Sequence, residues 1–161
     1  MNISTEEVFE TVNMTLHQNF DIRTVTLGIN LKDCMDRNID KLCARIEKRI
    51  VSKGSLLNKY ADLIQDKYGV PITNRRISVT PAAILLEPLP RNIKTAVKLA
   101  KALDRAAGLA GIDFIGGFGA LVQKGATASD ENLINAIPSA LSQTNRLCAF
   151  LNMASTLAGM N

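Results

Sequence analysis

The chain has 161 residues and a net charge of +4, with 47% hydrophobic and 21% charged residues. These values are typical of a globular domain with a sizeable core and argue against a disordered chain. Aromatic residues make up only 4%, Trp is absent, and 19 basic residues are mixed with 15 acidic ones, so we expect no nucleic-acid-binding surface.

The N-terminal segment predicts a helix followed by a strand. Ser4 and Glu7 have the spacing of a capping box, and apolar residues follow at helical spacing towards Asn19. From Ile22 to Leu31, apolar residues then alternate strictly with small polar ones. A period of two predicts a strand with one apolar and one polar face.

The middle of the chain repeats this order. An apolar stripe predicts a helix over residues 36–68, with Gly54 as a potential break and Gly69 as the stop. Residues 76–80 alternate again and predict a short strand. Another amphipathic helix is expected over residues 93–108.

The last third adds a third and a fourth unit. Residues 113–115 predict a short strand that runs into a glycine-rich loop. Ser129 is the expected N-cap of a helix that Pro138 splits or kinks. Residues 146–152 alternate and predict the final strand.

Helices and strands therefore alternate along the chain, which predicts a single α/β domain over residues 1–161 with a parallel sheet and right-handed crossovers. Strands buried on both faces read as continuous apolar runs, but these strands have a polar side. A barrel lumen or a ligand cleft would hydrate that side, and an open, one-sided sheet is the alternative. The residues expected there are Thr24, Thr26, Gly28, Asn30, Ser78 and Thr80.

Four stretches carry a resemblance to a known family: DIRTVTLGINLKDCMD at 21–36, NRRISVTP at 74–81, DFIGGFGALVQKGA at 113–126 and the closing NMASTLAGMN. The chain resembles the uncharacterised PFL family (uncharacterised protein family 0210, domain of unknown function 711). The resemblance implies part of a ten-stranded α/β barrel like that of pyruvate formate-lyase, a homodimer and, for some relatives, an ACT-domain regulator as partner. Family members are longer, so this chain resembles their N-terminal part.

The resemblance brings no established activity and no cofactor. Radical chemistry does not follow from a fold alone, and no segment resembling the glycyl-radical motif RVxGY occurs here. Part of a barrel would leave edge strands unpaired and apolar surface open. We therefore expect the isolated chain to dimerise or aggregate.

The cysteines and the single histidine bear on compartment and metal binding. Cys34, Cys43 and Cys148 form no CxxC pair, and His17 stands alone on a predicted helix. We expect a reducing, cytoplasmic compartment and no metal site. No apolar run is long enough to cross a bilayer, and acidic residues stand where a signal peptide would be basic, so we expect no membrane association.

Asp33 and Cys34 are the candidate catalytic residues, because they follow the first strand, where α/β folds place chemistry. A packed cysteine after a capping aspartate is the alternative. Cys148 shares the polar side of its strand and is a further thiol that can face the lumen.

The ligand-binding candidates are Gly116, Gly117, Lys124, Asn152 and Ser155. Glycines let the backbone approach an anionic ligand, and Lys124 supplies positive charge. The alternative is that these glycines admit close packing. Arg23, Arg75 and Arg76 are expected to form salt bridges.

Two function classes follow. The first is an enzyme-like α/β barrel protein that binds a small anionic metabolite in a pocket at the carboxyl ends of its strands. The second is a non-catalytic ligand-binding or regulatory homodimer that retains an enzyme fold. The residues do not decide whether the protein is an enzyme.

Overall fold

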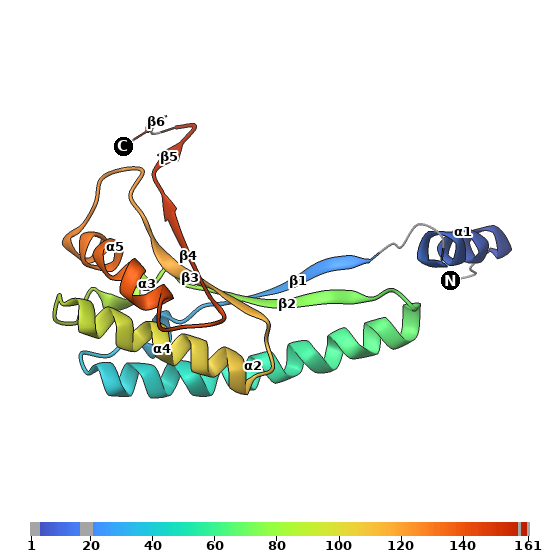
Figure 1. Ribbon diagram of the computed structural model, residues 1–161, viewed down its shortest axis with the longest axis horizontal. Helices are drawn as coiled ribbons and strands as arrows, with labels where there is room; N and C mark the ends of the chain where they lie inside the picture. The colour runs from blue at the N-terminus through green and yellow to red at the C-terminus, as the bar shows by residue number, and fades with distance from the viewer. Residues whose placement is uncertain (1–3, 17–20, 158, 161) are drawn as a thin grey trace.

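A computed structural model describes residues 4–16, 21–157 and 159–160 (Figure 1). The elements in chain order are α1 (Thr5–Leu16), β1 (Ile22–Ile29), η1 (Lys32–Cys34), α2 (Ile39–Tyr68), β2 (Ile72–Val79), α3 (Ala82–Leu86), α4 (Ile93–Leu109), β3 (Phe114–Leu121), α5 (Ala128–Leu141), β4 (Leu147–Asn152), β5 (Ala154–Ser155) and β6 (Gly159–Met160). The helical position of His17 lies outside the described residues.

The α/β architecture is confirmed. The four main strands form one parallel sheet in the order β1-β2-β3-β4, and β5 and β6 form a small antiparallel pair. A parallel sheet in sequential order requires a crossover between successive strands, and the long helices supply these crossovers. Among the described residues no helix is both long and apolar enough to cross a bilayer.

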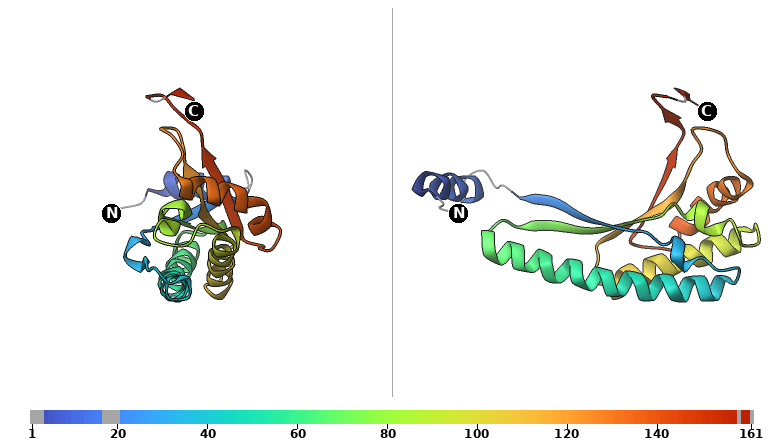
Figure 2. Two further views of the ribbon diagram at one scale, coloured as in Figure 1. Left: turned by 90° about the vertical axis from the view of Figure 1, so that its left-hand side faces the viewer. Right: turned by 180° about the vertical axis from the view of Figure 1, so that it is seen from behind.

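All the long crossover helices cover the same face of the sheet. Helix α2 contacts β1 and β2, whereas α4 and α5 contact β3 and β4 and each other. Figures 1 and 2 show α2 and α4 side by side beneath the sheet. The core between these layers includes Ile46, Ile77, Leu103 and Ile115, all fully buried. Burial of such side chains is the main source of stability, at about 1.5–3 kcal/mol each.

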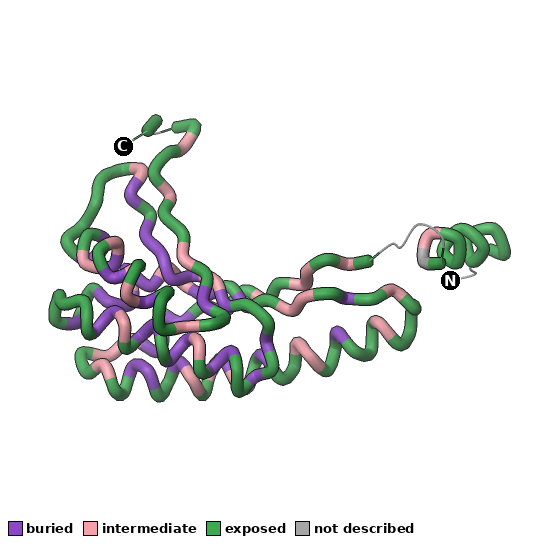
Figure 3. Tube along the Cα trace, viewed as in Figure 1, coloured by how far each residue is buried: buried purple, intermediate pink, exposed green. Residues whose placement is uncertain are grey.

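The opposite face of the sheet is open. Of the six residues predicted there, Thr26, Gly28, Asn30 and Ser78 are exposed, and Thr24 and Thr80 are half-buried. On the other side Ile29, Ile77 and Val79 are buried. Figure 3 shows buried residues concentrated where the sheet meets the helices. The predicted polar side of the strands is therefore confirmed.

Helix α2 is continuous through Gly54, where a break was expected. A Cβ at this position would lie 2.7 Å from the Cβ of Ala110, so the glycine permits close contact between α2 and the loop after α4. The helix begins later than expected, at Ile39, because the Asn38 side chain accepts hydrogen bonds from the N–H groups of Asp40 and Lys41. The predicted stop at Gly69 is confirmed by its left-handed conformation, with φ of 67°.

Strand β3 differs most from the prediction. It runs from Phe114 to Leu121, so the glycines lie within the strand and the expected glycine-rich loop is wrong. Glycine weakens a strand signal because it contributes no side chain to the period-two pattern. The tertiary pairing with β2 and β4 holds the strand together despite this.

Helix α5 is capped by Thr127 rather than Ser129. The Thr127 side chain accepts from the N–H of Asp130 while the Asp130 carboxylate accepts from the N–H of Thr127, which completes a capping box. Ser129 instead lies inside the helix and its buried hydroxyl donates to the carbonyl of Ala83. Pro138 is accommodated within the helix and does not split it.

The N-terminal helix α1 lies apart from the body, beyond the far end of β1 (Figure 1). Its predicted capping box is confirmed, with the Ser4 N–H donating to Glu7 at 2.7 Å and the Glu7 N–H donating to Ser4 Oγ at 3.2 Å. The apolar side chains of this helix are exposed, Phe9 to 74% and Leu16 to 69%. The distal half of α2 exposes a second apolar set: Leu56, Tyr60, Leu63, Ile64 and Tyr68.

Candidate functional site

The strands end at two levels. Ile29 at the end of β1 pairs with Val79 at the end of β2, and Ser78 pairs with Gly116 in β3. Beyond this level β3 and β4 continue alone as a pair (Figure 1). The carboxyl ends of β1 and β2 therefore lie level with the middle of β3.

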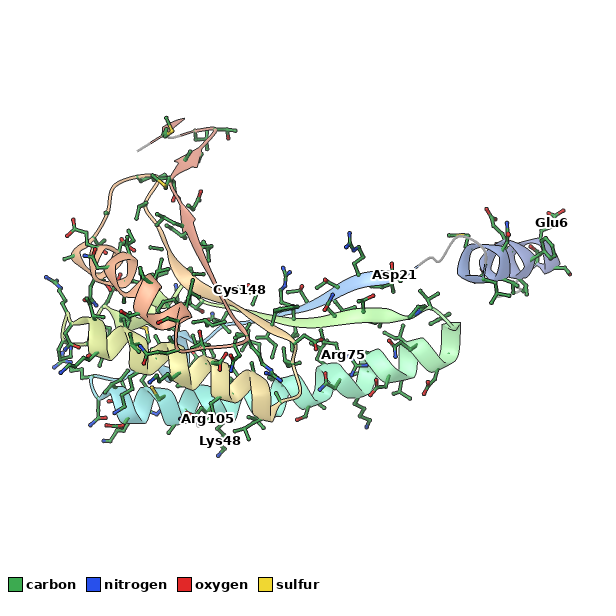
Figure 4. The ribbon with its side chains drawn as sticks, viewed as in Figure 1. Glu6, Asp21, Lys48, Arg75, Arg105 and Cys148 are labelled. Atoms are coloured by element: carbon green, nitrogen blue, oxygen red, sulfur yellow. The ribbon has the colours of Figure 1, made fainter. Side chains whose placement is uncertain are left out.

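One row of small residues crosses the open face at this level. The strand register places them next to one another in the order Gly28, Ser78, Gly116, Cys148. A Cβ at Gly28 or at Gly116 would meet no atom within 4 Å. The row thus makes a smooth, accessible floor with one hydroxyl and one thiol, and Figure 4 labels Cys148 on β4.

Polar groups border this floor on both sides. Towards the strand ends, Thr80 Oγ1 lies 3.3 Å from Asn30 Oδ1 and accepts a hydrogen bond of 3.0 Å from the N–H of Leu31. In the other direction Arg76, two residues before Ser78, is exposed. The salt bridge expected for Arg76 is not found, because no carboxylate among the described residues lies within ion-pair distance of it. Its neighbour Arg75 forms the expected salt bridge, with Asp62. A cation beside hydroxyl and amide groups suits a small polar or anionic ligand.

Gly117 and Gly119 have a different role from Gly116. Gly117 has a φ of 120°, and a Cβ there would lie 2.5 Å from Val79 Cγ2 and 2.7 Å from the Val79 carbonyl oxygen. A Cβ at Gly119 would collide with Phe150. A register shift lies between Gly116 and Phe118, and Gly117 occupies it. These contacts favour the packing role that the sequence left open for these two positions.

Lys124, Asn152 and Ser155 lie at the far end of the longer strand pair. Asn152 pairs with Leu121, and its carbonyl accepts from the N–H of Val122 at 2.9 Å. Lys124 is exposed in the turn that follows, and Ser155 is half-buried in β5. Leu121 is five residues beyond Gly116, or about 16 Å along a strand. The structure therefore places Asn152 near the turn that carries Lys124, and both a strand segment away from Gly116.

Asp33 and Cys34 lie in η1, on the helical side of the sheet. Cys34 is only 3% exposed and packs in the core. Burial raises the pKa of its thiol, the Arg49 charge opposes this, and the Asp33 charge adds to it. A protonated, buried thiol is a poor nucleophile, so this geometry favours the packed-cysteine alternative. Asp33 is exposed and points to Arg49, with Oδ2 3.9 Å from Nη1.

The structure does not bring these two residues together with the glycines. The hollow that Asp33 and Cys34 line is completed by residues of α2 and by none of Gly116, Gly117 or Lys124. In the described part of the chain, no group of three His, Cys, Asp or Glu side chains is arranged to hold a metal ion.

The floor of the open face was only partly visible in the sequence. The sequence predicts Gly28, Ser78 and Cys148 on the polar side of a strand, but it predicts Gly116 in a loop. Extending the period of two through Phe114 and Gly116 would have put Gly116 on that side as well. The four residues form a row only because of the register between neighbouring strands. Local sequence does not encode this register.

Comparison with known protein families identifies the chain's relatives. The family model described as "Uncharacterised ACR (DUF711)" matches residues 13–161. The chain belongs to the DUF711 (UPF0210) family. It is 50% identical over all 161 residues to a UPF0210 protein of Methanococcoides burtonii and 45% identical over 161 residues to one of Thermoanaerobacter sp.. The expected membership of this family is thereby confirmed.

The DUF711 relatives are much longer than this chain. The chain is covered completely in both of these matches but spans only 35% of each relative. The relatives carry names that state no activity, so the family assigns no function.

Proposed function

We propose that this chain forms part of a small-metabolite-binding, enzyme-like α/β protein whose pocket lies on the open face of the sheet, at the carboxyl ends of its strands. The observation that carries the proposal is the row of Gly28, Ser78, Gly116 and Cys148, an accessible floor beside the ends of β1 and β2. Ligands of α/β folds gather at the carboxyl ends of strands.

The ligand is small and anionic. Arg76 and Lys124 offer positive charge from the two ends of the face, and Gly116 permits close approach to the backbone. Asn152 and Ser155 extend the site along the longer strands. Gly117 is a packing contact, and Asp33 and Cys34, the catalytic candidates of the sequence, lie on the helical side and have no role in this pocket.

We also propose that the open face is the inner surface of a ten-stranded barrel like that of pyruvate formate-lyase. Both edges of the main sheet, β1 and β4, are available for further strands among the described elements. The chain spans 35% of the length of the two relatives compared above, so those longer proteins contain enough further residues to continue the sheet. A cytoplasmic setting suits three free cysteines.

The second candidate function is a non-catalytic ligand-binding or regulatory homodimer, with an ACT-domain protein as a further partner. The exposed apolar side chains of α1 and of the distal half of α2 favour an association of this kind. A homodimer is compatible with the same open-face pocket.

An unbiased metabolite screen by thermal shift tests the proposal, since a ligand of the folded state raises its melting temperature. Every hit is then measured with Gly116→Val, whose added Cβ meets no atom within 4 Å, and with Gly108→Ala as control. Gly108 is exposed in α4, and its added Cβ also meets no atom within 4 Å. We expect Gly116→Val to abolish the ligand-induced shift and Gly108→Ala to keep it. Full shifts in both variants would refute a site on this face.

A further inference from the structure

The hollow that Asp33 and Cys34 line lies on the outer side of the molecule, between η1 and the first half of α2. It encloses about 420 Å³, within the range of small-molecule sites. Figure 4 shows Lys48 on the side of α2 away from the sheet. The lining residues are Asp33, Cys34, Arg45, Lys48, Arg49, Ser52 and Lys53.

Charge is segregated between two sides of α2 at this point. The acidic residues Asp40 and Glu47 face α4, where Asp40 pairs with Lys98 at 2.6 Å and Glu47 pairs with Arg105. The hollow on the other side is lined by four basic residues and one acidic residue, Asp33. On the basic side of the helix, Arg45 and Arg49 have carboxylates nearby, whereas Lys48 and Lys53 have no ion pair among the described residues.

The two arginines of the hollow are held in different ways. Arg45 is anchored by Asp36 at 3.1 Å and by the carbonyl of Met35 at 3.3 Å. The Arg49 guanidinium is 3.9 Å from the Asp33 carboxylate, which is beyond hydrogen-bond distance. Arg49 thus stays in the hollow with its donors available to a ligand.

The remaining polar side chains are donors as well. Lys48, Ser52 and Lys53 follow one another along the exposed side of α2, and none has an ion pair or a side-chain hydrogen bond in the described structure. The hollow therefore offers two ammonium groups, a hydroxyl and a guanidinium fork against a single carboxylate. This donor excess selects an anion.

The inner wall of the hollow adds no competing charge. Cys34 packs in the core, and burial raises the pKa of its thiol, which keeps the sulfur neutral. The inner wall therefore places no negative charge against a bound anion.

We propose that this hollow is a second site, which binds the phosphate group of a small phosphorylated metabolite. A phosphate dianion matches several converging donors better than a carboxylate does, because it carries more charge and more acceptor oxygens. The lining contains no aromatic ring on which a nucleic-acid base would stack. The site shares no cationic residue with the open face and does not depend on the function proposed there.

Isothermal titration of the whole chain with inorganic phosphate, at constant ionic strength, tests this site. The variant Lys48→Gln/Arg49→Gln removes two donors from the hollow. The matched control Lys59→Gln/Lys94→Gln removes the same charge at exposed positions outside it. We expect the first variant to bind phosphate at least about tenfold more weakly, because it removes two cationic donors that would pair with the phosphate oxygens. The control should stay within about twofold of the parent.

Asp33→Asn provides a test in the opposite direction. Removal of the one carboxylate should tighten phosphate binding several-fold, an outcome that damage to the fold would not produce. The site is refuted by a parent chain that shows no saturable phosphate binding, or by equal losses in the two lysine-containing double variants. Tighter binding of a single-stranded RNA than of phosphate, weakened by the same variant, would assign the surface to a polyanion and overturn the proposal. Unchanged phosphate binding in Gly116→Val would show that this site is separate from the open face.

Discussion

Two adjacent glycines in β3 should respond to the same substitution in opposite ways. Gly117→Val places a Cβ 2.5 Å from Val79 Cγ2 and forces a branched residue into a φ of 120°. Left-handed strain costs about 1–2 kcal/mol and overpacking about 1–3 kcal/mol, so we expect a loss of about 2–5 kcal/mol. For a chain of this size that corresponds to a fall in melting temperature of roughly 4–20 °C.

Gly116→Val should be neutral or stabilising. Its Cβ meets no atom within 4 Å, and valine has a higher strand propensity than glycine, on a scale that spans about 1 kcal/mol. Thermal and urea unfolding of both variants beside the parent measures the difference. Equal losses in the two variants, or a Gly117→Val protein that melts with the parent, would refute the distinction between a packing glycine and an open-face glycine.

Three further predictions concern the core, a buried thiol and the exposed apolar surface. Leu27→Asp puts a charge against the core and should abolish soluble expression, whereas Thr26→Asp on the open face should not; equal solubility of the two would contradict the strand's orientation. Burial, aided by Glu47, raises the pKa of the Cys43 thiol from 9.0 to about 11, so its stabilising effect should be complete below pH 9 and be lost as the pH rises towards 11. The free energy of unfolding, measured with urea, should therefore fall more for the parent than for Cys43→Ala between pH 9 and pH 11. Parallel pH profiles of the two proteins would contradict this prediction. Because Phe9 and Leu16 are exposed, the parent should self-associate, and Phe9→Gln/Leu16→Gln should self-associate less. Light scattering measures the molar mass of both proteins, and a monodisperse parent monomer would disprove this prediction.

Local sequence patterns predicted most of the elements. These patterns depend on residues that are close together in the chain. Examples are the capping box of Ser4 and Glu7, the period of two in β1 and the glycine stop at Gly69. Helix α3 was missed because its five residues are too short to show a helical period. Strand β2 was predicted too short, since its first half has no clear alternation of apolar and polar residues.

The features that position the candidate site were not predictable in the same way. Gly54 and Gly117 look like helix and loop breakers in sequence, but the structure shows that Ala110 and Val79 crowd them. Those neighbours are distant in the chain, so only tertiary packing reveals why glycine is required. The donor-rich hollow of α2 likewise depends on which side of the helix faces α4, where Asp40 and Glu47 are neutralised.

The central claim, a ligand site on the open face, is tested most directly by the reactivity of Cys148. This thiol is exposed at one end of the floor, whereas Cys34 and Cys43 are buried. The rate of Cys148 alkylation is measured with and without each metabolite that raises the melting temperature. A ligand at ten times its Kd should slow the reaction about tenfold, since about one site in eleven is then empty. An unchanged alkylation rate for every stabilising metabolite would contradict a site on this face.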